Sequence, residues 1–160
     1  MQRRHFTTWA ALAVTTPLTA PSALAHHGWS SFDLEQPLYL EGRVLQVAWR
    51  NPHAEFELEL AADLRLPADL AQRKLPAQSA SVDGPRLLQA AKVPTRKERR
   101  WQVELAPLQR MQAWNVSPLK VGDSVAVLGF TLADAKAAPL VRVEFLFVGG
   151  QTYGLRSSPA

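Results

Sequence analysis

The sequence contains no cysteine. This absence excludes disulfide bonds, thiolate metal sites, iron–sulfur clusters and cysteine nucleophiles. The chain also lacks a phosphate-binding loop, a zinc-finger spacing, a dinucleotide fingerprint and the Gly-x-Ser-x-Gly pattern of serine hydrolases. Ser30 and Ser31 stand near His27 and Asp33, but without a nucleophile elbow these residue types do not predict a catalytic triad. With 160 residues and 47% hydrophobic composition, the chain is expected to form about one globular domain.

No apolar run is long enough to favour a transmembrane helix, which needs about 20 predominantly apolar residues. The apolar stretch over residues 9–24 is short and is interrupted by two prolines. It follows Arg3 and Arg4 and ends in an Ala-x-Ala sequence at Ala25. These features predict a signal peptide over residues 1–25 that resembles a twin-arginine leader and is cleaved after Ala25. We therefore expect a periplasmic protein with no membrane span in its mature chain.

The positive charge of the chain is concentrated in one segment. The formal net charge is +4, and removal of residues 1–25 leaves 16 basic residues against 14 acidic ones. Nine of the basic residues and only three of the acidic ones lie in residues 65–100, so the rest of the mature chain is acidic. A local basic segment in an exported protein does not predict a nucleic-acid partner.

Alternation of apolar and polar residues predicts five strands. The first, over residues 38–49, slips in its alternation beside Gly42, which predicts a β-bulge. The clearest is the second, over residues 54–60, where apolar residues alternate with glutamates. The others are expected over 101–105, over 124–132, and in a fifth strand whose inner face would be Val141, Val143, Phe145 and Phe147. A short helix is expected from Pro107 to Trp114.

The order of three strands, a short helix and two strands predicts an all-β fold with one short helix, a five-stranded OB-like Greek-key barrel. The barrel would span residues 38–150, after an N-terminal arm over 26–37 and before a C-terminal tail over 151–160. Residues 65–100 are rich in proline, lack a sustained apolar period and are expected to be an insertion with short helices around 69–74 and 86–92. A partly open β-sandwich and an antiparallel sheet with one packed helix are the alternatives.

The histidines suggest a metal site. Cleavage after Ala25 would make His26 the first residue, so that its α-amine and its imidazole could chelate one ion. His53 could add another ring nitrogen, completing the three-nitrogen set called a histidine brace, with His27 as an alternative ligand. Nitrogen ligands without thiolates favour Cu(II), with Zn(II) or Ni(II) next.

The environment of His53 follows from its position before the second strand. Counting by two, it shares a face with Glu55 and is expected to point outward, with Glu55 orienting its ring. Trp29, beside the histidines and outside any expected strand, is a candidate for a partly exposed contact. The alternative interpretation is a mobile terminal His-His pair and a solvated His53.

Several motifs resemble a family of small exported bacterial proteins that carries a domain-of-unknown-function label. They are Ala-His-His at 25–27, Gly-x-Val at 42–44, Trp-x-Asn-Pro-His at 49–53 and a Gly-Asp turn at 122–123. The resemblance implies a periplasmic β-barrel domain without an established activity and supports His26, His27 and His53 as its site residues. The insertion over 65–100 departs from the family pattern.

Two functions of different classes follow from these observations. The first is a non-catalytic periplasmic protein that carries or buffers copper. The second is an OB-like interaction module that binds a periplasmic protein or an oligosaccharide without metal. A copper oxidase is a third interpretation, but no feature marks a substrate surface, so the sequence does not predict an enzyme.

Overall fold

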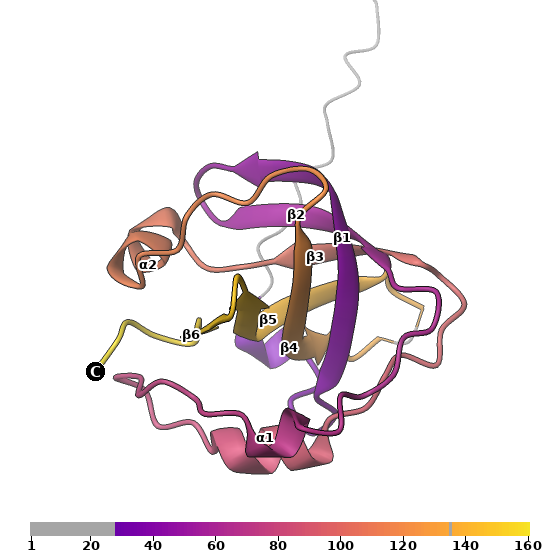
Figure 1. The fold of residues 1–160 in the computed structure, drawn as a ribbon, viewed down its shortest axis with the longest axis horizontal. Coiled ribbons are helices and arrows are strands. Elements are labelled where there is room, and N and C mark those ends of the chain that lie inside the picture. Colours follow the sequence, from indigo (N-terminus) through magenta and orange to yellow (C-terminus); the bar gives the residue numbers. More distant parts are fainter. Residues whose placement is uncertain (1–27, 135) are drawn as a thin grey trace, which may run out of the picture.

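The structure is a computed structural model that describes residues 28–134 and 136–160. Six strands and several short helices are assigned in this part of the chain (Figure 1). In chain order they are η1 (Trp29–Ser31), β1 (Leu38–Trp49), β2 (Ala54–Leu60), η2 (Leu70–Gln72), α1 (Gly84–Ala90), β3 (Arg100–Glu104), α2 (Leu108–Ala113), β4 (Ser124–Thr131), β5 (Leu140–Val148) and β6 (Gln151–Gly154).

The first five strands close into a barrel. The sheet order is β3-β2-β1-β4-β5-β6, and an additional pairing joins β3 to β5. All these pairings are antiparallel except β3 with β5, which is parallel. This is the connectivity of an OB-type barrel, so the predicted fold class is confirmed.

The inward-facing residues of all five barrel strands form one apolar core. Trp101, Val103 and Leu58 are completely buried in it, and α2 contributes Met111 from one end of the barrel. The alternation of β2 and β3 matches this burial pattern, because their apolar side chains face the core and their polar side chains face outward. Strand periodicity therefore predicted the core-facing residues of these two strands correctly.

Two strands contain a shift in pairing register, and only the one in β1 was predicted from the sequence. In β1 the register with β2 shifts between Val44 and Gln46, as expected from the slip near Gly42. In β5 the register with β4 also shifts, because Leu128 pairs with Phe145 and Gly129 with Val143. The prediction that Phe145 joins Val143 on the inner face is therefore wrong: one extra residue reverses the alternation.

Phe145 and Phe147 belong to a second apolar cluster on the outside of the barrel, whereas Leu146 enters the barrel core. The insertion covers this cluster with Leu70 of η2 and Leu88 of α1. Figure 1 shows the insertion running along one side of the barrel. It is thus a packed layer on the barrel, although its sequence has no apolar period.

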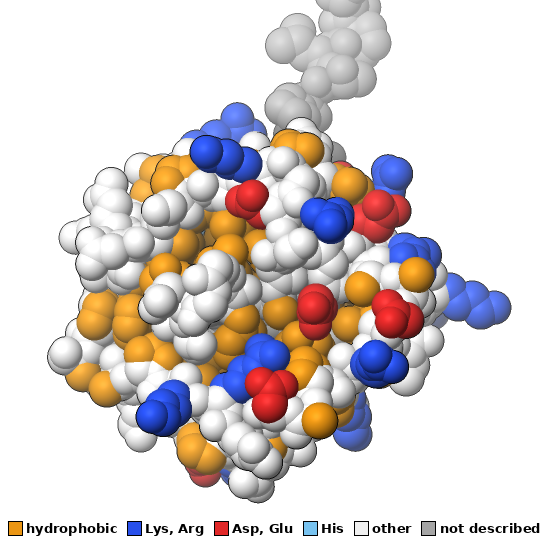
Figure 2. All heavy atoms as spheres, viewed as in Figure 1, with side chains coloured by type: hydrophobic (Ala, Val, Ile, Leu, Met, Phe, Trp, Pro, Cys, Tyr) orange, Lys and Arg blue, Asp and Glu red, His pale blue; other side chains and the backbone are white. Residues whose placement is uncertain are grey.

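Charged side chains are dispersed on the face that Figure 2 shows. Lys and Arg side chains are interspersed there with Asp and Glu, and apolar side chains lie between them. Positive charge is therefore not gathered into a single patch on this face.

The expected tail over 151–160 includes a sixth strand. Gly149 and Gly150 both have positive φ angles, 57° and 76°, and turn the chain back so that β6 pairs with β5. Leu155 follows β6 and is buried in the barrel core. Among the described residues, no helix has the length and apolar character that crossing a membrane would require.

Replacement of Gly42 tests the close approach of β1 to β2. A Cβ at this position would collide with the backbone carbonyl oxygen of Glu59. We expect Gly42→Ala to lower the free energy of unfolding by about 1–3 kcal/mol, as overpacking does. Gly28→Ala is the matched control, since a Cβ there would meet only Ser30 Oγ at 3.6 Å. Urea unfolding measures both, and equal stability of the two variants would contradict the packing described.

Candidate functional site

His53 lies in the turn between β1 and β2, directly after the cis peptide bond that joins Asn51 to Pro52. Its side chain is 14% exposed and its Nδ1 lies 3.3 Å from Glu104 Oε1. Glu104 ends β3, where the flanking Val103 and Leu105 face the barrel core. His53 therefore lies on the outer side of the barrel wall, as expected, but it is largely covered.

Glu104 also forms a close ion pair on the same side of the barrel. Arg142 of β5 is its partner in the parallel β3–β5 pairing, and Arg142 Nη2 lies 2.6 Å from Glu104 Oε1. Both side chains are less than one-tenth exposed. A buried carboxylate in such a position needs a positive partner, because an unpaired buried charge is strongly destabilising.

Trp29 packs against two guanidinium groups. Its ring centroid is 4.9 Å from Cζ of Arg142 and 3.6 Å from Cζ of Arg156, which are cation–π distances. Its ring also meets Phe130 edge-on at 6.3 Å. We call Trp29, Arg142 and Arg156 the tryptophan clamp. The clamp attaches the N-terminal arm to the barrel next to the Glu104 pair.

The second arginine of the clamp is held by a completely buried carboxylate. Arg156 Nε donates to Glu144 Oε2 at 2.7 Å, and Gln78 Nε2 of the insertion donates to Glu144 Oε1 at 3.4 Å. Nearby, Arg110 of α2 donates to the carbonyl oxygen of Leu155. Burial lowers the pKa of Arg110, the positive charge of Arg142 lowers it further, and Glu144 opposes both. Residues from the arm, the insertion, the barrel and the C-terminal segment thus meet in one polar cluster.

The predicted site residues are only partly within the described chain. His26 and His27 lie outside the described residues, so the structure tests neither. Among residues 28–134 and 136–160, no group of three or more His, Asp or Glu side chains is arranged to hold a metal ion. Of the three predicted ligands, the described part of the chain contributes His53.

The expectation that Glu55 orients His53 is wrong. Glu55 Oε2 accepts a hydrogen bond from Gln102 Nε2 at 3.1 Å, whereas the carboxylate beside His53 Nδ1 is that of Glu104. Counting along β2 identified the correct face but not the neighbouring strand. Glu104 pairs with Glu55 across the sheet, so it stands on the same face.

The charged residues of the cluster were not predicted from the sequence. A signal existed in β5, where Arg142 and Glu144 interrupt a strand that is otherwise apolar from residue 140 to 148. Such a pattern predicts outward-facing charges, but it does not reveal that the N-terminal arm covers them. Trp29 was correctly expected to be partly exposed.

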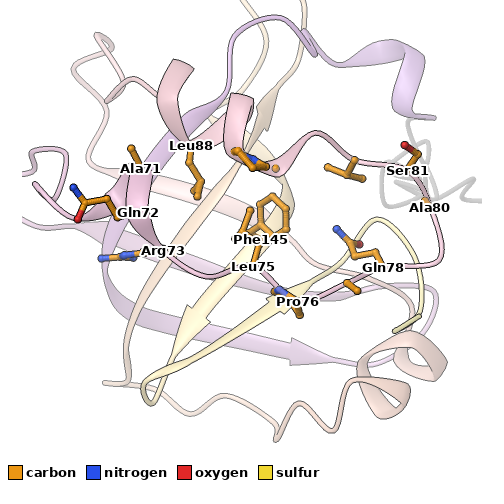
Figure 3. Close-up of a pocket in the computed structure, with 14 residues that line it drawn as sticks. Ala71, Gln72, Arg73, Leu75, Pro76, Gln78, Ala80, Ser81, Leu88 and Phe145 are labelled. Atoms are coloured by element: carbon orange, nitrogen blue, oxygen red, sulfur yellow. The ribbon is translucent and has the colours of Figure 1, made fainter.

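A separate cavity of about 460 Å³ lies between the insertion and β5. Figure 3 shows Leu75 beside Phe145 in its wall, with Arg73 directed away from them. Of the described residues that line it, only Arg73 carries a charge. Its guanidinium stacks over Phe147 at 4.8 Å and bonds Asp69, so it is committed to the packing of the insertion.

Comparison with known proteins gives one match. The sequence model of a family of unknown function, DUF6152, matches residues 15–65. This stretch is less than half of the chain, but it contains His26, His27 and His53. No curated protein and no solved structure matches this chain. The resemblance to an uncharacterised family is thereby confirmed for the N-terminal stretch and for β1 and β2.

Proposed function

We propose that the exported, processed chain binds Cu(II) in the periplasm and carries or buffers it without catalysis. His26 would supply its α-amine and a ring nitrogen, and His53 another ring nitrogen, with His27 as the alternative ligand. The observation that carries the proposal is the attachment of Trp29, three residues after His26, to the same cluster that holds His53.

Chain geometry supports this ligand set. Consecutive Cα atoms are about 3.8 Å apart, so the Cα atom of His26 is at most about 11 Å from that of Trp29. From the Trp29 ring, contacts run through Arg142 and Glu104 to His53. Processing after Ala25 would therefore leave only three residues of chain ahead of Trp29 to reach the His53 ring.

The surroundings of His53 also suit a metal ligand. A carboxylate at one ring nitrogen orients the imidazole and raises its basicity, as in the carboxylate–histidine–metal arrangement common in proteins. With Nδ1 beside Glu104, a metal would be bound through Nε2. The α-amine of a first residue has a pKa of about 7.7 to 8.0, so a divalent ion displaces its proton readily near neutral pH.

The ligand set is tested by titrating the processed protein with Cu(II) in competition with a chelator. We expect one Cu(II) per chain, and an affinity at least about tenfold lower when the α-amine of His26 is acetylated or when His53 is changed to alanine. Acetylation removes the α-amine as a ligand but leaves every side chain in place. Unchanged affinity in both cases would refute the proposal and favour the metal-free interaction module.

The role of Glu104 is tested with a matched pair of variants. We expect Glu104→Gln to weaken Cu(II) binding by about tenfold or more, because a neutral amide polarises and orients the imidazole less than a carboxylate does. Glu55→Gln is the control, since it removes a carboxylate from the same face of the barrel without touching His53.

Glu104→Gln also leaves Arg142 without its closest carboxylate, so stability must be measured alongside. We expect a loss of about 3–5 kcal/mol in the free energy of unfolding. Affinities are therefore compared at low temperature, where near-UV circular dichroism verifies that both variants are folded. Equal affinity of folded Glu104→Gln and Glu55→Gln proteins would show that Glu104 does not orient a ligand.

A further inference from the structure

The N-terminal arm would be attached to the barrel even without the tryptophan clamp. The arm is already fixed by backbone hydrogen bonds to the end of β4, from Asp33 N to the carbonyl oxygen of Thr131 and from Ala133 N to that of Ser31. Phe32 is 4% exposed and forms an isolated bridge with Leu132. The clamp adds a second attachment point, closer to the N terminus.

The two arginines of the clamp are each held in place by a partner other than Trp29. Arg142 is held by Glu104 and Arg156 by Glu144, and both carboxylates are buried. An ion-paired guanidinium has lost most of its rotamer freedom, so stacking an aromatic ring on it costs little further entropy. The two arginines therefore form a rigid surface against which one aromatic ring can pack.

We propose that Trp29 is a positioning residue for the metal site. By packing against Arg142 and Arg156, it sets the effective concentration of the processed N terminus at His53. This inference rests on the proposed function. Trp29 is not itself a metal ligand. It acts only by setting how many residues lie between the N terminus and the first point of attachment to the barrel.

The size of the effect follows from tether length. With Trp29 in contact with the arginines, the chain from His26 to the first attachment is three residues long, and without the clamp it extends five residues to Ser31, whose carbonyl oxygen accepts from Ala133 N. For a tether longer than the gap it spans, effective concentration falls roughly as the −3/2 power of tether length, so this lengthening lowers it about twofold. Loss of Trp29 should therefore weaken only that part of Cu(II) affinity which depends on joining the N terminus to His53.

A double-mutant cycle with Cu(II) titration tests this inference. We expect Trp29→Ala to weaken binding by about twofold or more in the otherwise unchanged chain and to have no further effect in a His53→Ala background. Trp29→Phe should recover part of the affinity, since a smaller ring can still pack against the arginines. Trp114→Phe is the control, because this partly buried tryptophan lies outside the clamp and donates to the carbonyl oxygen of Ser157.

A second variant keeps the clamp intact, in case Trp29→Ala impairs folding. Insertion of Gly-Ser-Gly between Gly28 and Trp29 doubles the tether and should weaken binding about threefold. If His53→Ala weakens binding but neither Trp29→Ala nor the insertion does, the clamp has no positioning role and the proposed function stands. If His53→Ala itself has no effect, the proposed function fails instead. An equal loss from Trp29→Ala in both backgrounds would show that the effect is structural and would overturn the inference.

Discussion

The ion pairs of Glu104 with Arg142 and of Glu144 with Arg156 are the constraint on which the arrangement of the outer barrel surface depends. Glu144 is fully buried, and Glu104 is nearly so. Buried carboxylates are tolerated only with charged partners, so β3, β5 and the C-terminal segment must come together correctly. The N-terminal arm then covers the arginines with Trp29. Strand alternation predicts that these charged side chains of β3 and β5 point to solvent. Instead, they form a polar cluster that is shielded from water and includes His53.

Two segments cover different parts of the outer barrel surface. The insertion covers an apolar part that includes Tyr39, Leu128 and Phe147. The arm covers a charged part, where Trp29 packs over Arg142 and Arg156. The bulge at Glu144 produces this division, because it separates the charged outward residues of β5 from the aromatic ones. The insertion and the arm are thus both structural layers, and each meets the cluster at Glu144 or beside it.

Strand positions and topology could be predicted because apolar alternation and turn residues are local properties. The bulge in β1 was visible because the apolar alternation slips by one residue between Leu40 and Leu45, although the register shift itself falls between Val44 and Gln46. The bulge in β5 was hidden because both faces of that strand carry apolar residues. His53 was assigned to the correct face by counting. Its partner Glu104 comes from a strand almost fifty positions away, and the cover comes from the arm, so neither could follow from spacing.

We propose that one metal ion joins the processed N terminus to His53 at the barrel wall. This is tested by paramagnetic broadening in the ¹⁵N NMR spectrum of the exported protein, recorded with substoichiometric Cu(II). We expect selective loss of the Ala54 amide and Trp29 indole signals together with those of the first residues. Broadening confined to the first residues, with the start of β2 unaffected, would contradict it.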